Sequence, residues 1–179
     1  KGYHYIHTAI RDPEIRREVS EAMREGQRGL ATRYGQELAG GPEQIEQILG
    51  RFENPGLADP IARVGRDPAR KLAAHDRLVG AARLAGQAGI PPQHLALAAA
   101  AALCFSNPSD LGSGELLRKI EASGLGPSLR SVCGLNPRRG FGKQVHARWS
   151  ELRQGWLPGN LLLSLDQLLW ARSDSNMIV

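Results

Sequence analysis

The chain has 179 residues, 41% of them hydrophobic, and a formal net charge of +5. A chain of this length can bury one core, and its longest apolar run, Leu95 to Phe105, is too short to span a bilayer. Only 5% of the residues are aromatic and the basic residues are scattered, so we expect no nucleic-acid partner, because single-strand binding uses more stacking rings. The composition predicts a cytoplasmic protein without a membrane anchor.

All predicted elements are helices, and the first clear one begins at Asp12-Pro13. Asp12 is expected to cap the free backbone amides, and Pro13 stands where its missing N–H costs nothing. The helix should end at Gly35. Its predicted buried face is Ile15, Val19, Ala22 and Met23, continued by Leu30 and Tyr34.

A second helix is expected from Pro42, and two short helices follow it. The predicted buried residues of the second helix are Ile45, Ile48, Leu49 and Phe52. Asp59-Pro60 and Asp67-Pro68 repeat the helix-start signal, so two short helices should meet at a corner near Gly65.

The remainder of the chain also has helical periodicity. Helices are expected over 76–89, from Pro91-Pro92 to Phe105, over 113–123, over 127–133 and around Val145, Trp149 and Leu152. A last helix, 161–170, is expected to dock on the bundle or to mediate self-association with another subunit. Two cysteines build neither a disulfide framework nor a zinc site, so reduced core thiols are expected.

The fold class predicted from these elements is all-α, a multi-helix orthogonal bundle. The composition changes after Asn136-Pro137, where a basic, glycine-rich segment begins. We therefore divide the chain into a helical domain over 1–137 and an additional helical tail over 138–179.

Basic residues are concentrated around the predicted corner: Arg63, Arg66, Arg70, Lys71 and Arg77. Arginine presents a planar fork that matches two phosphate oxygens, and lysine adds a compact charge. Side chains that converge from two short helices could hold one anionic metabolite. The alternative is a solvated basic face, in which the arginines near a helix end merely complement the helix dipole.

The same segment resembles the C-terminal helical domain of the long-chain, zinc-independent mannitol dehydrogenases. The matching residues are Ile48 to Pro55, Asp59, Arg63 to Pro68, Arg70 to Leu72 and Asp76 to Leu78. Weaker agreement includes Arg33-Tyr34-Gly35 and Gly89-Ile90-Pro91, and the similarity covers about three quarters of the chain.

The resemblance implies the C-terminal half of a two-domain, NAD-dependent polyol-phosphate dehydrogenase that converts mannitol 1-phosphate to fructose 6-phosphate. In that family NAD is held by an N-terminal Rossmann domain, and the catalytic lysine lies in a K-x-x-x-x-N-x-x-H motif. Neither is present in this sequence, so we expect a domain fragment that does not catalyse the reaction alone. His4 and His7 lack the asparagine at the required spacing and are expected to be ordinary helix residues.

Carried over to the matching positions, the resemblance assigns Arg63, Arg66 and Lys71 to the substrate, as ligands of the polyol or its terminal phosphate. Some family members for free polyols have histidine at the position of Arg66, so arginine there favours a phosphorylated substrate. No catalytic, cofactor-binding or metal-binding residue is expected in this chain. A second hypothesis is a stand-alone helical module that binds an anionic ligand or a protein partner.

Overall fold

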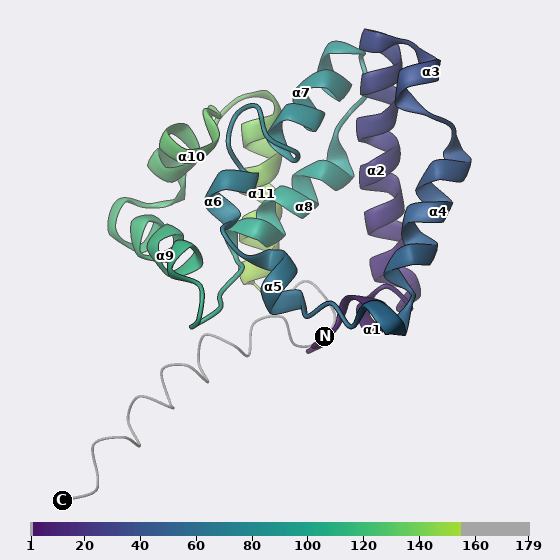
Figure 1. Cartoon of the computed structure of the whole chain (residues 1–179). Coiled ribbons are helices and arrows are strands. Elements are labelled where there is room, and N and C mark those ends of the chain that lie inside the picture. The colour runs from purple at the N-terminus through teal and green to yellow at the C-terminus, as the bar shows by residue number, and fades with distance from the viewer. Residues whose placement is uncertain (1, 155–179) are drawn as a thin grey trace, which may run out of the picture.

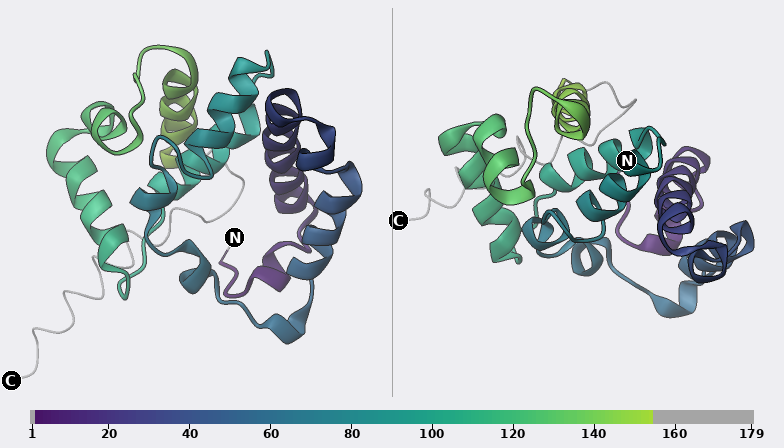
Figure 2. Two further views of the ribbon diagram at one scale, coloured as in Figure 1. Left: turned by 45° about the horizontal axis from the view of Figure 1, so that its top comes forward. Right: turned by 90° about the horizontal axis from the view of Figure 1, so that it is seen from above.

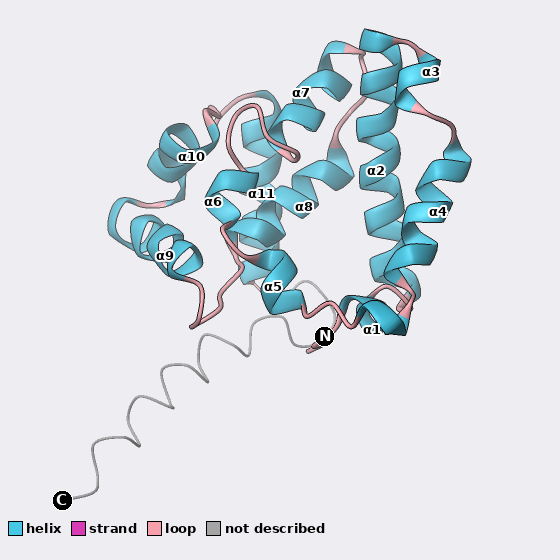
Figure 3. Ribbon diagram, viewed as in Figure 1, coloured by secondary structure: helices cyan, strands magenta, loops and turns pink. Residues whose placement is uncertain are grey.

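The structure is a computed structural model, and it describes residues 2–154, which form helices joined by short connections (Figure 1). Figure 3 shows no strand in this part of the chain, which confirms the all-α prediction. The first helices are α1 (Ile6–Ala9), α2 (Pro13–Tyr34), α3 (Gln36–Ala39), α4 (Pro42–Phe52), the 3-10 turn η1 (Pro55–Leu57), α5 (Ile61–Gly65) and α6 (Pro68–Lys71). The others are α7 (Val79–Gln87), α8 (Gln93–Leu103), α9 (Leu111–Ser123), α10 (Leu125–Cys133) and α11 (Gly140–Arg153).

The alanine-rich helix α8 lies at the centre of the bundle. It packs against α2 and α7 on one side and against α11 on the other, while α9 and α10 lie beyond α6 (Figure 2). Four alanines and leucines of α8 have no exposed surface or almost none: Ala96, Ala99, Ala100 and Leu103. Small side chains here let neighbouring helices approach closely, which a helix of larger residues would prevent.

Local signals fix the long helix α2 at both ends, as predicted. The Asp12 carboxylate accepts hydrogen bonds from the backbone N–H groups of Glu14, at 3.0 Å, and Ile15, at 3.2 Å. At the other end Gly35 has a φ of 91°, a backbone conformation that favours glycine.

The predicted buried face of α2 is confirmed only in part, because Val19 and Met23 pack against the buried cluster of Ile10, Ile45 and Leu49. Its buried residues are Ser20, Glu25, Gly26 and Gly29. Gly26 and Gly29 lie against α7, and Glu25 bonds to α8. The predicted residues Ile15, Val19, Ala22 and Met23 are half-buried. Leu30 and Tyr34 are 39% and 55% exposed. Gly29 occupies the closest helix contact because a side chain there would meet the backbone of α7, whereas Glu25 is buried because it accepts backbone N–H groups of α8.

Helix α4 agrees with its prediction in part. Ile45 and Leu49 are buried and pack with Ile10. Ile48 is half-buried, and Phe52 is 38% exposed, so its assignment to the core is wrong. Phe52 lies in the last position of the helix.

Helix α11 extends the main core beyond the predicted domain boundary at 137. Its Val145 and Leu152 belong to the same buried cluster as Leu103 and Leu129. The division into 1–137 and 138–179 stays a prediction, and the expected helix 161–170, with any self-association through it, lies outside the described residues. Within residues 2–154 no helix is long and apolar enough to cross a bilayer.

Both cysteines are free thiols, as the sequence predicts. Burial raises the pKa of each to about 11, so neither is ionised near neutral pH. Cys133 has no exposed surface, whereas Cys104 is only partly buried.

The close contact between α2 and α7 predicts that a methyl group added at Gly29 lowers the stability of the fold. A Cβ at Gly29 would lie 2.5 Å from the backbone nitrogen of Ala85, so Gly29→Ala should lower the free energy of unfolding by about 1–3 kcal/mol. Gly50→Ala is the control, because nothing lies within 4 Å of a Cβ there and the helix should gain about 0.5–1 kcal/mol. Urea unfolding of both variants measures the difference, and equal effects would contradict the packing described.

Candidate functional site

The predicted corner is present between α5 and α6, and Asp67 forms it. This residue has a φ of 52°, in the left-handed region that side chains rarely adopt. Its carboxylate accepts a hydrogen bond from the backbone N–H of Arg70 at 3.2 Å, so it caps α6 as predicted. The buried ring of Pro68 follows and fixes the start of the helix.

A hollow of about 610 Å³ lies beside this corner. Its charged lining residues are the cations Arg63, Arg66, Arg70, Lys71 and Arg77 and the carboxylates Asp67 and Asp110. The other lining residues are Val64, Ser109, Leu111 and Gly112. The three residues predicted to bind substrate therefore border one space, which we call the basic hollow.

The three predicted residues differ in how many of their donors are already used within the chain. The Arg63 guanidinium forms an ion pair with Asp59, one turn earlier in the chain. The Lys71 ammonium donates hydrogen bonds to the backbone carbonyls of Val64, at 2.6 Å, and of Arg66. Lys71 thus satisfies the carbonyls at the C-terminal end of α5 and has one of its three donors left.

Arg66 is exposed, and its guanidinium has no hydrogen-bond or ion-pair partner among residues 2–154. The two neighbouring arginines are paired: Arg70 with Asp67 at 3.1 Å and Arg77 with Asp76 at 2.9 Å. Arg66 is consequently the lining cation with its full set of five donors available.

The excess of positive charge in the basic hollow affects the pKa of Lys71. Burial lowers the pKa of its ammonium, and the nearby charges of Arg77 and Arg70 lower it further, against the opposing effect of Asp67 and Asp110. A bound anion would relieve this repulsion. The site is therefore suited to a negatively charged ligand.

Sequence reasoning missed the wall that α9 contributes. Ser109, Asp110, Leu111 and Gly112 close the basic hollow from the opposite side. Asp110 caps α9 by accepting the backbone N–H of Ser113 at 3.2 Å. An Asp before a predicted helix signals such a cap, but no sequence pattern shows that α9 folds back onto the corner.

Comparison with known proteins decides the family. Residues 1–123 match the model of the mannitol dehydrogenase C-terminal domain. The chain belongs to this family. It is also 32% identical, over 153 residues, to a mannitol-1-phosphate 5-dehydrogenase from Caldanaerobacter subterraneus subsp. tengcongensis. The match covers 86% of this chain and 40% of that relative.

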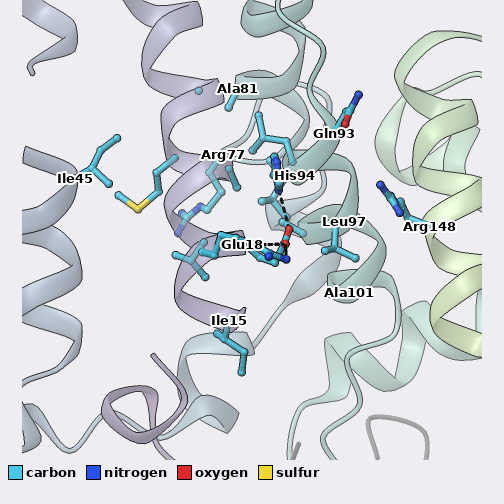
Figure 4. Close-up of a pocket in the computed structure, with 18 of the residues that line it drawn as sticks. Ile15, Glu18, Ile45, Arg77, Ala81, Gln93, His94, Leu97, Ala101 and Arg148 are labelled. Carbon is cyan, nitrogen blue, oxygen red and sulfur yellow. Dashed lines mark hydrogen bonds and ion pairs between the residues drawn. The ribbon is translucent and has the colours of Figure 1, made fainter. Parts of the chain in front are cut away.

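The chain also has a larger cavity of about 1010 Å³, whose apolar lining residues come mainly from α2, α4 and α8, with others from α7 and α11. Figure 4 shows Ile15 and Ile45 on one side and Leu97 and Ala101 on the other. Of the predicted substrate residues none lines this cavity. This cavity also has charged lining residues, but its three arginines, Arg17, Arg77 and Arg148, are matched by three glutamates, Glu14, Glu18 and Glu151. Five cations and two carboxylates line the basic hollow, which is therefore the better candidate for an anion.

Two glutamates of α2 tie it to the N-terminal end of α8. The Glu25 carboxylate accepts the backbone N–H groups of His94 and Leu95, both at 2.9 Å. The Glu18 carboxylate lies 2.7 Å from the Nδ1 of His94, as Figure 4 shows. These groups are arranged to hold two helices together.

The N-terminal histidines show no catalytic arrangement. His7 lies in α1 and stacks on Tyr5 with ring centroids 5.5 Å apart. His4 precedes α1, so its assignment to a helix is wrong. Its carbonyl accepts the N–H of Ile61 at 2.9 Å, which joins the start of the chain to α5. Residues 2–154 contain no cluster of three His, Cys, Asp or Glu side chains that could hold a metal ion.

The Glu18–His94 pair predicts a pH dependence of stability. Burial alone would raise the pKa of Glu18, but hydrogen bonds to His94 and Arg17 outweigh it and lower the pKa below 4.5. A lowered carboxyl pKa stabilises the fold above pH 4.5, and this contribution is lost as the pH falls through the folded-state pKa. Glu18→Gln should therefore lower the free energy of unfolding by about 1 kcal/mol at pH 7 and by less at lower pH.

Urea unfolding of Glu18→Gln and the unsubstituted chain between pH 7 and 3 tests this. Glu37→Gln, in the exposed part of α3, is the control. A difference from the unsubstituted chain that stays constant with pH would contradict the assignment of Glu18.

Proposed function

We propose that this domain binds the substrate of an NAD-dependent polyol-phosphate dehydrogenase that converts mannitol 1-phosphate to fructose 6-phosphate. The observation that carries the proposal is Arg66, an unpaired guanidinium in a hollow lined by four other cations. The name of the relative, which is 32% identical, supports the same substrate.

In this proposal Arg66 is the main ligand of the phosphate. A guanidinium offers parallel N–H groups that match two phosphate oxygens, and each hydrogen bond to a charged group contributes about 1.5–3 kcal/mol. Lys71 contributes its remaining donor and its charge. Arg63, with part of its donor set on Asp59, contacts the polyol hydroxyls.

The chemistry of hydride transfer is assigned to an N-terminal Rossmann domain. NAD, when bound there, accepts the hydride from the carbinol carbon, and the lysine of the family motif acts as general acid and base. Residues 2–154 form no parallel sheet of the kind that holds a dinucleotide. The residues of this chain supply binding energy and orientation, which place the reacting carbon correctly. The cytoplasm is the proposed location.

The alternative function is a helical module that binds an anion or a protein partner without a dehydrogenase domain. Two exposed apolar residues line the basic hollow, Leu111 and Val64, which are 81% and 44% exposed. Apolar surface beside this hollow favours docking on another protein. The two functions differ in the ligand: the first requires recognition of the polyol as well as of the phosphate.

Arg66→Ala should raise the Kd of the chain for mannitol 1-phosphate at least tenfold, because one charged hydrogen bond alone corresponds to about that factor. The Kd for unphosphorylated mannitol should change little. Isothermal titration with both ligands measures this, and the control is Arg51→Ala, an exposed arginine in the last turn of α4 that does not line the basic hollow.

Equal effects of Arg66→Ala on both ligands would remove the phosphate role. Mannitol 1-phosphate that binds no more tightly than inorganic phosphate would instead favour the alternative module.

A further inference from the structure

We propose that Asp110 is a positioning residue for substrate binding: it holds the corner backbone at Asp67 and so sets where the cations of the basic hollow point. The inference rests on the proposed function, since it concerns the same hollow. It assigns a role to a residue that contributes no positive charge and lies outside the basic segment.

One carboxylate oxygen of Asp110 makes both contacts. It accepts the backbone N–H of Asp67 at 3.0 Å and the backbone N–H of Ser113 at 3.2 Å. The first bond joins residues 43 positions apart, and the second caps α9. The side chain of Asp110 therefore fixes the corner to the first turn of α9.

The α9 side of this bridge is rigid. Ser113 has no exposed surface, and its hydroxyl donates to the backbone carbonyl of Asp110 at 2.9 Å. Gly112 lies against the corner, because a Cβ built there would be 3.4 Å from the Cα of Asp67. The first turn of α9 is thus a fixed support for Asp67.

The corner side of the bridge needs that support. Asp67 is in the left-handed region, which costs about 1–2 kcal/mol for a residue with a side chain, and surrounding contacts must stabilise it. From this conformation its carboxylate accepts both the N–H of Arg70 at 3.2 Å and the Nε–H of Arg70 at 3.1 Å. Arg66 directly precedes Asp67, so a shift of the corner moves both arginines.

The negative charge of Asp110 and its role as a hydrogen-bond acceptor have opposite expected effects on anion binding, so the two can be separated by experiment. As a negative charge in the basic hollow, the carboxylate opposes an anionic ligand. As a hydrogen-bond acceptor, it keeps the cations in place. Asp110→Asn removes the charge but keeps an acceptor oxygen. Asp110→Ser keeps a residue that caps helices well but is too short to span from α9 to Asp67.

Isothermal titration calorimetry measures the binding of mannitol 1-phosphate and of mannitol to the unsubstituted chain and to both variants. Hydrogen exchange of the Asp67 amide is measured by NMR on the same samples. We expect Asp110→Ser to raise the Kd for mannitol 1-phosphate at least fivefold and to speed exchange of the Asp67 amide. Asp110→Asn should bind as tightly as the unsubstituted chain or more tightly, with the amide still protected.

Asp12→Ser is the matched control, because Asp12 also caps a helix through its carboxylate but does not line the basic hollow. Ser still caps α2 in this variant, so the Kd for mannitol 1-phosphate should not change. An unchanged Kd in Asp110→Ser, or an equal loss in Asp110→Asn and Asp110→Ser, would overturn the positioning role. Failure of the unsubstituted chain to bind mannitol 1-phosphate would overturn the proposed function itself.

Discussion

The left-handed backbone of Asp67 is the constraint on which the candidate site depends. It turns the chain between α5 and α6 within two residues, so that Arg63 and Arg66 approach from one helix and Arg70 and Lys71 from the next. A continuous helix would spread these side chains around its axis. The bend instead places them around one hollow, against the first turn of α9.

The same side chains both build the corner and line the basic hollow. Lys71 satisfies backbone carbonyls of α5, and Arg70 pairs with Asp67, the residue that caps its own helix. Only Arg66, among the described lining cations, keeps all its donors for a ligand. Five positive charges can lie close together here because three of them, on Arg63, Arg70 and Arg77, are paired with aspartates. Arg66 has no such partner in the described part of the chain and remains available.

Much of this arrangement follows from the sequence. The Asp-Pro pairs predict the two short helices, and Asp67 caps α6 as the pattern indicates. Asp59 does not cap α5, whose N-cap is Pro60, and pairs with Arg63 instead. The basic residues between 63 and 77 point to the candidate site because their spacing spans the corner. These signals are local, and local hydrogen bonds with the backbone decide them.

The parts that the sequence could not predict depend on contacts between distant residues. The most buried residues of α2 are Ser20, Glu25, Gly26 and Gly29. Close packing on α7 favours glycine, and the carboxylate of Glu25 caps α8. A search for helical periodicity considers apolar residues only and does not find them. The ion pair of Arg63 with Asp59 and the bridge from Asp110 to Asp67 are likewise set by tertiary approach. Neither has a sequence signature.

The most direct test of the central claim is a crystal structure of this chain with mannitol 1-phosphate bound. The account predicts the phosphate in the basic hollow, with its oxygens within hydrogen-bond distance of the Arg66 guanidinium and the Lys71 ammonium. A phosphate bound elsewhere, without contact to Arg66, would contradict it.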